Sequence, residues 1–299
     1  MKPEPTIRLL SLGAGVQSTT LALMACDGTL PGLDAAIFAD TGWEPPAVYR
    51  QVDLLESELA RSGIPLHRVS NGNLRNDSIN PEHRYASIPY FVKNPDGTQG
   101  MGRRQCTSEY KLVPINRKVR ELLGAEPPKF RSVKRGKVAE QWIGFSTDEI
   151  HRADNKKQNL YTVKRYPLLD LGMSRRDCDR WLKAAGWGHT AKSACIGCPF
   201  HGNAQWRDLR DNHPEQWDDA VAFDKAIRKG GSRGLPLNGE AFLHRSLVPL
   251  DLAPIDKIGR KEWADRQIDI FDEIAENGDP DGCSPYGCRS GEPVVEETV

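Results

Sequence analysis

Three short apolar runs alternate with two helical patterns in the first 70 residues, and this alternation constrains the fold more than any other feature. The runs are residues 7–12 (IRLLSL), residues 35–39 and the segment PLHRVS. Between them lie a helical pattern at about 17–26 and a longer one after Pro45-Pro46, where apolar residues recur at helical spacing. Strand, helix, strand, helix, strand predicts an α/β fold with a parallel sheet flanked by helices.

The middle of the chain continues this pattern with an interruption. Residues 71–103 are polar and rich in Gly, Pro and Asn, which predicts a long loop or a lid near a site. Residues 107–123 have the spacing of an amphipathic helix, and the segment QWIGF reads as a fourth strand. Ser174, with Asp177 three residues later, predicts the capped start of another helix.

The pattern changes after Cys198. Helical segments are expected at about 203–229 and 257–276, and the last 20 residues are acidic and rich in Gly and Pro. We therefore predict three parts, which are a nucleotide-binding domain over 1–200, a helical region over 201–278 and a flexible tail over 279–299.

The composition is that of a water-soluble protein. The chain has 299 residues, 38% of them hydrophobic, and a formal net charge of zero. No apolar run approaches the roughly 20 residues of a membrane span, and residues 1–10 lack the apolar core of a secretory signal. The sequence therefore predicts a cytoplasmic protein without a membrane partner, and its net charge gives no indication of nucleic-acid binding.

The loop after the first apolar run is a candidate anion site. Backbone N–H groups of residues 13–18 and the positive end of the following helix would point to one place. Gly13, Ala14 and Gly15 would let a phosphate approach the backbone. The stretch lacks the lysine of the GxxxxGK[ST] loop, so a tight turn without a ligand explains it equally well. The predicted binding residues here are Ser11, Gly13, Ala14, Gly15, Gln17 and Ser18.

The second strand ends in Asp40-Thr41-Gly42. In an open α/β sheet, ligands bind beyond the carboxyl ends of the strands, and this end lies beside the first loop. Asp40 is therefore expected to bind a ribose, an adenine amine or a magnesium ion, with Thr41 and Gly42 beside it. The alternative is that Asp40 only forms the turn before Gly42.

The segments GAGVQSTTLAL and ADTGWEPPAVY resemble the phosphoadenylyl-sulfate (PAPS) reductase family, part of the PP-loop group of adenine-nucleotide α-hydrolase-like enzymes. The similarity continues in family order through RQCTSEYKLVPI, WIGFSTDEIHRA, YPLLDLGMSRRDCDRWL and CIGCPF, and it covers roughly residues 8–200. The resemblance implies the same α/β fold, with ATP or PAPS and Mg²⁺ as ligands. Gln17 stands where ATP-using members often carry Asp.

The resemblance also implies roles for three further residues. Lys111 follows Cys106 at the family's CxxxxK spacing and would face phosphate or sulfate, unless it is an exposed helix lysine. Arg152 matches an arginine near the nucleotide, with a salt-bridged surface arginine as the alternative. Gly144 matches the strand glycine of the nucleotide site. Reductases tend to have an arginine two residues after that glycine, and this chain has Ser146 there.

Seven cysteines in a chain expected in the cytoplasm indicate metal or redox chemistry more than a disulfide framework. Cys195 and Cys198 have CxxC spacing, which suits one iron or zinc ion. Cys106 follows Arg103 and Arg104 at a helix start, an electropositive setting that favours a thiolate. The family resemblance implies a [4Fe–4S] cluster on these three cysteines. Zinc and no metal remain the alternatives.

The other four cysteines have different expected roles. Cys178 lies on an apolar helix stripe and Cys26 ends a helix, so both are expected to be core residues. Cys283 and Cys288 lie in the tail, where Cys288 is a candidate fourth cluster ligand. The family's reductases use a cysteine in a C-terminal ECGLH stretch as nucleophile. This tail lacks that stretch, so a catalytic role and idle thiols both stay open for the pair.

Three functions remain open at this point. The first is an ATP pyrophosphatase whose adenylation drives sulfur incorporation into DNA, as in phosphorothioation, or into tRNA. The basic run 129–137, with five cations and one aromatic residue, favours a nucleic-acid acceptor or is a solvated loop. The second is an adenylyl-sulfate or PAPS reductase that releases sulfite with thioredoxin. The third is a sensing module that binds nucleotide and cluster without turnover.

Overall fold

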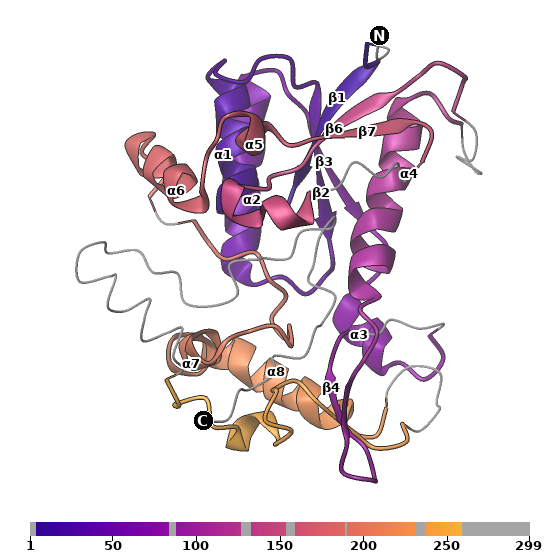
Figure 1. Cartoon of the computed structure of the whole chain (residues 1–299), viewed down its shortest axis with the longest axis vertical. Helices are drawn as coiled ribbons and strands as arrows, with labels where there is room; N and C mark the ends of the chain where they lie inside the picture. The colour runs from indigo at the N-terminus through magenta and orange to yellow at the C-terminus, as the bar shows by residue number, and fades with distance from the viewer. Residues whose placement is uncertain are drawn as a thin grey trace.

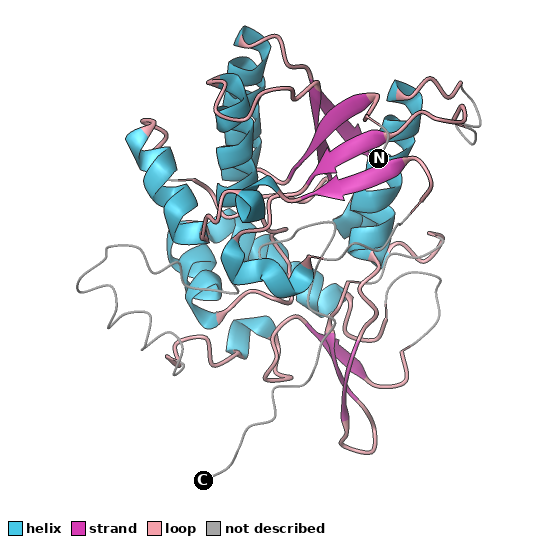
Figure 2. Cartoon of the chain, turned by 45° about the horizontal axis from the view of Figure 1, so that its top comes forward, coloured by secondary structure: helices cyan, strands magenta, loops and turns pink. Residues whose placement is uncertain are grey.

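A computed structural model describes residues 4–83, 88–126, 133–153, 159–188, 190–230 and 237–258. Its main sheet has five strands in the order β3-β2-β1-β6-β7, and every neighbouring pair is parallel. The strands are β1 (Ile7–Leu12), β2 (Ala35–Asp40), β3 (Leu66–Ser70), β6 (Ala139–Trp142) and β7 (Thr162–Arg165). This parallel sheet flanked by helices confirms the predicted fold class (Figures 1 and 2).

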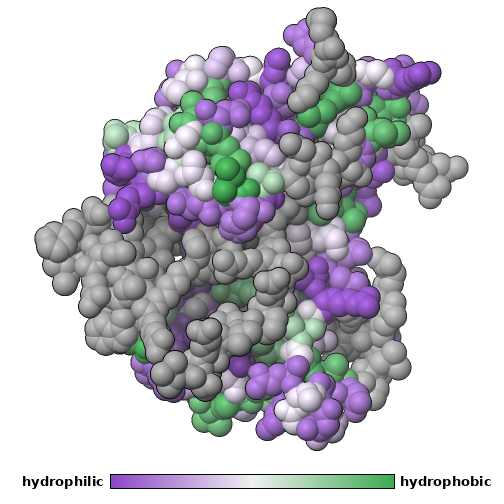
Figure 3. All heavy atoms as spheres, in the orientation of Figure 1, coloured by the Kyte–Doolittle hydropathy of each residue, from purple (hydrophilic) through white to green (hydrophobic). Residues whose placement is uncertain are grey.

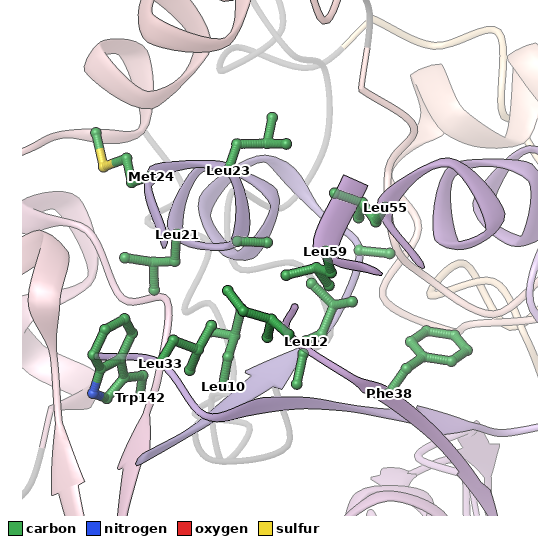
Figure 4. Close-up of a cluster of buried hydrophobic side chains, with 14 of the residues drawn as sticks. Leu10, Leu12, Leu21, Leu23, Met24, Leu33, Phe38, Leu55, Leu59 and Trp142 are labelled. Atoms are coloured by element: carbon green, nitrogen blue, oxygen red, sulfur yellow. The ribbon is translucent and has the colours of Figure 1, made fainter. Parts of the chain in front are cut away.

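One face of the sheet is covered by three helices, α1 (Val16–Cys26), α2 (Pro46–Arg61) and α6 (Arg175–Ala184). Residues 16–24 of α1 are all buried, because this helix packs against the sheet, α2 and α6 at once. Figure 4 shows side chains of this core. They include Leu10, Leu12 and Phe38 from the sheet, Leu21 and Leu23 from α1, Leu55 and Leu59 from α2, and Trp142 from β6.

The opposite face of the sheet is covered by α4 (Val113–Leu122) (Figure 1). Ile115 and Val119 of this helix pack on Leu9 and Ile37 of the two central strands. A π-helical segment, η1 (Thr107–Leu112), precedes α4 and continues directly into it, so the predicted helix over 107–123 exists but begins with a wider turn.

The helix ends follow local sequence signals. Pro46 is the first residue of α2, where a missing N–H costs nothing, and Gly63 with a φ of 73° follows its last turn. Ser174 caps α6 and accepts from the backbone of Asp177, whose side chain accepts from the Ser174 N–H. This capping box confirms the start predicted from these two residues.

A second, smaller layer lies below the main sheet in Figure 1. Residues 71–103 are not one long loop. They contain α3 (Leu74–Ile79), β4 (Phe91–Lys93) and β5 (Gln99–Met101). Strand β4 also pairs with β8 (Glu240–Phe242), so this antiparallel sheet joins the middle of the chain to its later part. Strands of three residues are too short to show a period in the sequence.

The later helices are α7 (Asn203–Asn212) and α8 (Pro214–Ala226). The helix expected over about 203–229 is broken at His213, because Pro214 begins a new helix there. Trp206 of α7 and Phe223 of α8 are fully buried in a core that also contains Trp43 and Tyr110. The short elements are α5 (Pro167–Asp170) and the 3₁₀ segments η2 (Thr147–Arg152) and η4 (Leu250–Leu252).

The tail predicted over 279–299 and nearly all of the helix predicted over 257–276 lie outside the described residues. None of the helices in the described part of the chain has both the length and the apolar character that a membrane crossing needs. On the face seen in Figure 3, hydrophilic residues surround smaller hydrophobic patches over the described atoms.

Candidate functional site

The turn between β1 and α1 has the geometry of an anion site. Ala14 has a positive φ of 58°, which is uncommon for a residue with a side chain. Gly15 is the N-cap of α1 and offers no side chain to the first N–H groups of the helix. No acidic residue lies in the first turn of α1. Backbone donors and the helix dipole therefore favour a negatively charged group at this turn.

Two contacts fix the shape of this turn. The Gly13 N–H donates to Ser18 Oγ at 3.2 Å, and the Ser18 hydroxyl donates to the Gly15 carbonyl at 3.3 Å. Gly144, just beyond the end of β6, lies against the same turn. A Cβ atom on Gly144 would lie 3.1 Å from the Ser18 nitrogen and 3.3 Å from the carbonyl carbon of Gln17. Glycine at 144 thus lets the segment after β6 approach the loop.

Gln17 is held by residues from two other segments. Its Nε2 donates to Glu149 Oε2 at 2.9 Å, and its Oε1 accepts from Arg175 Nη1 at 3.4 Å. Arg152 forms an ion pair with the other oxygen of Glu149, and its guanidinium stacks 4.6 Å from the centre of the Phe145 ring. Arg152 is therefore salt-bridged, as the alternative reading of the sequence had it, but it is buried rather than on the surface.

Asp40 ends β2 on the other side of β1. Its Oδ1 accepts from the Gly42 N–H at 2.7 Å and from the Tyr49 hydroxyl at 2.8 Å. Burial, followed by the hydrogen bond to Asp40, raises the pKa of Tyr49, so this hydroxyl stays protonated and donates. Ser11 lies within β1, where its hydroxyl accepts from Gln141 Nε2 at 2.9 Å, so its side chain contacts a neighbouring strand.

A buried glutamine, Gln51 of α2, joins the turn to the segment that leads to the CxxC pair. Its Nε2 donates to the Ala14 carbonyl at 2.8 Å and to Thr19 Oγ1 at 2.9 Å. Its Oε1 accepts from the Ala191 N–H at 2.8 Å. All three contacts are buried or nearly so, which makes them costly to lose.

Three predicted metal ligands, Cys106, Cys195 and Cys198, line one small hollow. Cys106 comes immediately before the π-helical segment, a type of turn that is frequent at functional sites. Arg104 also lines the hollow, with its guanidinium 4.7 Å from the centre of the Phe200 ring. The remaining lining residues are Trp43, Leu74, Ile88, Pro89, Gly197 and Pro199.

The cysteine thiols around this hollow are chemically suited to bind a thiophilic metal or an iron–sulfur cluster. Thiolate sulfur is the ligand of zinc sites and of iron–sulfur clusters, and the remaining wall is largely apolar. Glu44 Oε2 is buried nearby and has no hydrogen-bond partner within the described part of the chain. Across those residues no three His, Cys, Asp or Glu side chains form a group that could hold a metal ion.

A buried polar cluster connects Cys195 to the end of β2. The Thr41 hydroxyl donates to Glu44 Oε1 at 3.1 Å, and Cys195 Sγ lies 3.3 Å from Thr41 Oγ1 and 3.6 Å from Glu44 Oε1. Lys111 Nζ forms an ion pair with the same Glu44 oxygen at 3.7 Å. Lys111 is only 5% exposed, so it is not the exposed helix lysine of the alternative reading.

Trp43, which directly precedes Glu44, holds the CxxC turn in place. The Trp43 carbonyl accepts from the Ile196 N–H at 3.0 Å, and its indole N–H donates to Asp219 of α8 at 2.7 Å. A Cβ atom on Gly197 would lie 2.1 Å from the Trp43 ring. The glycine inside CIGC is therefore required by the tryptophan that packs on it. The turn of residues 40–44 thus contacts the CxxC segment, and it begins at Asp40, the predicted ribose or metal ligand.

The remaining cysteines lie elsewhere. Cys178 is fully buried in the core beside α1, and burial raises its pKa to about 12, so it stays a thiol. This confirms the prediction that Cys178 is a core residue. Cys26 is only partly buried at the end of α1 and packs against the edge of the same core. Cys283 and Cys288 lie outside the described residues, and so do residues 129–132 of the basic run.

Four residues of the site were not predicted from the sequence, namely Glu44, Gln51, Glu149 and Arg175. Each is a single polar residue whose partner lies far away in the chain. Of these four, only Gln51 has a signal in the sequence, because it adjoins the apolar stripe of α2. In the structure it is 6% exposed. A polar residue at the edge of an apolar stripe is a hint of a buried hydrogen bond.

Fold and site together define a parallel α/β protein with a small-residue turn at a helix start and a cysteine-lined hollow beside the second strand. Among solved structures, the chain is similar to the crystal structure of phosphoadenylyl-sulfate (PAPS) reductase from Candida auris in a phosphate complex. The identity is 15% and the TM-score 0.36, over 62% of this chain and 76% of that one. The sequence matches no protein-family model and no curated protein.

Proposed function

We propose that the chain is an adenine-nucleotide-dependent enzyme of sulfur metabolism. In this proposal it is an ATP pyrophosphatase, and the adenylate it forms drives sulfur incorporation into a nucleic acid. One observation carries the proposal, namely the 3.3 Å contact between Thr41 Oγ1 at the end of β2 and Cys195 Sγ. This contact places the cysteine hollow next to the residue that follows Asp40, the proposed ribose or magnesium ligand, and a nucleotide-driven sulfur transfer needs the two sites to be close together.

The proposed reaction has two displacement steps. An oxygen of the acceptor attacks the α-phosphorus of ATP, and pyrophosphate leaves. A sulfur nucleophile then replaces that oxygen, and AMP leaves with it. Backbone amides of residues 13–18 would stabilise the charge at the phosphates, and Asp40 would bind ribose or a magnesium ion. A cluster held by Cys106, Cys195 and Cys198 would supply a place for the sulfur donor.

The acceptor that we propose is DNA or tRNA. The support for a nucleic acid is the basic run 129–137, which could follow a phosphate backbone. A thiolated product would be expected only in the presence of ATP and a sulfur donor. Competition by polyanions such as heparin would separate general charge attraction from use of the acceptor as a substrate.

The deciding experiment uses anaerobically purified protein in two reactions. One contains ATP and Mg²⁺ with DNA or tRNA, and the other contains PAPS or adenylyl sulfate with reduced thioredoxin. We expect pyrophosphate in the first and no sulfite in the second. Gly144→Val should abolish pyrophosphate release, because a larger side chain would push on the turn at Ser18. Gly100→Val in β5 is the matched control, because Gly100 is exposed and a Cβ atom there would meet its nearest atoms at 3.8 Å, an ordinary contact distance.

The other outcomes assign the other functions. Sulfite alone would make the chain a reductase, and Cys283→Ser and Cys288→Ser would then locate the nucleophile. Binding of nucleotide without either product would favour the sensing module. The cluster is tested separately by iron and sulfide content and by the visible absorption spectrum. Cys106→Ala should lower the iron content, and an unchanged content would remove this cysteine from the proposed ligands.

A further inference from the structure

The sheet order gives a bound nucleotide a direction, if the proposed function holds. Strand β1 is central, with β2 on one side and β6 on the other. Asp40, the candidate ribose or metal ligand, ends β2, whereas Gly144 and Glu149 follow β6. The turn at residues 13–15 lies between these two edges. A nucleotide with its ribose at Asp40 and its first phosphate at the turn would extend its terminal group toward the β6 side.

Arg175 is a cation placed at that side of the turn. Its Nη1 lies 3.4 Å from Gln17 Oε1, in the first turn of α1. Glu149 fixes the amide of Gln17, because Nε2 donates to it at 2.9 Å and so leaves Oε1 toward Arg175. The charge of Glu149 itself is balanced by Arg152 within a buried ion pair.

The backbone of Arg175 is also anchored next to the segment that follows Gly144. The Arg175 N–H donates to Asp148 Oδ2 at 2.6 Å, and the same oxygen accepts from the buried Ser146 hydroxyl at 3.2 Å. These hydrogen bonds therefore hold the start of α6 next to the segment after β6, beside the turn of residues 13–15. Asp148 is exposed, and in these two contacts its carboxylate accepts from a backbone N–H and from a hydroxyl.

The position of Arg175 in its own helix is unfavourable for a cation. It is the first residue of α6, where the positive end of the helix dipole repels positive charge. Arg175 therefore gains nothing from the dipole of α6, whereas it lies beside the turn that would hold a phosphate. A guanidinium can bind two oxygens of a phosphate or sulfate at once.

We propose that Arg175 binds the anionic group beyond the α-phosphate of the nucleotide, which is the pyrophosphate part of ATP or the sulfate of an adenylyl sulfate. Arg175 thereby selects nucleotides that carry a second anionic group over AMP. This inference rests on the proposed nucleotide site and adds a specificity-determining residue to it.

The test compares Arg175→Ala with Arg176→Ala, which removes the exposed neighbouring arginine from the same helix turn. Binding of ATP, inorganic pyrophosphate and AMP is measured by calorimetry for both variants and the wild type. Loss of charge-assisted hydrogen bonds should weaken binding of ATP and pyrophosphate by Arg175→Ala roughly 10- to 100-fold. AMP binding and the melting temperature should not change. Arg175→Lys should be intermediate, since lysine keeps the charge but not the two-pronged geometry.

Three results would overturn the inference while leaving the nucleotide site intact. The first is equal ATP binding by the two alanine variants when the wild type binds ATP. The second is an equal loss of AMP and ATP binding in Arg175→Ala. The third is a lowered melting temperature, which would make Arg175 a structural residue. If the wild type binds no adenine nucleotide at all, the proposed function fails and the inference fails with it.

Discussion

At the scale of single residues, the buried ion pair of Glu44 and Lys111 links stability to the site. The two side chains are 1% and 6% exposed, and their charged atoms lie 3.7 Å apart. Removal of one member of such a pair leaves the other charge buried without its counter-charge, which costs far more than a surface salt bridge is worth. The pair also contacts Cys195 through Glu44 Oε1, so it positions a predicted ligand.

We therefore expect Glu44→Gln and Lys111→Met each to lower the free energy of unfolding by about 3–5 kcal/mol. The double variant should recover much of this loss, because it buries neither charge of the pair. Urea denaturation of the four proteins at pH 7.5 measures the coupling. Additive losses would show that the two side chains act independently. Lys229→Met, which removes one partner of an exposed ion pair with Glu240, serves as the control and should change stability by less than about 1 kcal/mol.

At the scale of elements, Gln51 joins three parts of the chain that the sequence keeps far apart. From one turn of α2 it contacts the turn after β1, the first turns of α1, and the segment before the CxxC pair. A nucleotide that tightens the turn at Ala14 would act through this side chain on the segment at Ala191. Because binding free energies are reciprocal, a ligand bound at the CxxC segment would change nucleotide binding at the turn by the same factor.

Gln51→Leu keeps the size of the side chain and removes its hydrogen bonds. The Ala14 carbonyl and the Ala191 N–H would then be buried without this partner, so we expect a loss of about 2–4 kcal/mol in unfolding free energy. Nucleotide should also protect the CxxC cysteines from alkylation less well than in the wild type. Mass spectrometry of iodoacetamide-treated protein measures this protection. Arg50→Leu, an exposed change in the same helix, should leave both quantities unchanged.

The sequence predicted the elements whose signal is local. The α/β order, the stop of α2 at Gly63 and the capped start of α6 at Ser174 depend on residues close together in the chain. The sheet of β4, β5 and β8 was missed because it depends on the pairing of Phe91 with Phe242, and three-residue strands show no alternation. The partners of Gln17 were missed for the same reason, since Glu149 and Arg175 are distant in sequence.

At the scale of the whole molecule, buried histidine links stability to pH. Burial, with a smaller contribution from Arg245, lowers the pKa of His244 to about 4 from an ordinary value of 6.5. Its ring contacts Ser246 Oγ at 2.7 Å and Asn203 Oδ1 at 3.0 Å, an arrangement that suits the neutral ring. Between pH 6.5 and about pH 4, the ring of His244 is therefore neutral in the folded protein and protonated in the unfolded chain.

The stabilising contribution of neutral His244 is complete above pH 6.5 and declines as the pH falls from 6.5 toward 4, because the unfolded state binds more protons there. Between pH 7.5 and pH 5 this decline should amount to about 2 kcal/mol. Urea unfolding at the two pH values measures it. His244→Gln should remove this part of the pH dependence. A variant with the same pH dependence as the wild type would contradict the assignment.

The pairing of β4 with β8 has a consequence for the order of events during synthesis. Cys106 leaves the ribosome early, but the layer that encloses its hollow includes helix α8, through the contact of Trp43 with Asp219, and strand β8. That layer cannot close until residues near 242 have been translated. Until then the cysteines that have already been translated stay accessible to a metal-delivery protein or to an oxidant. Any cofactor they bind is enclosed only when β8 has been added to the layer.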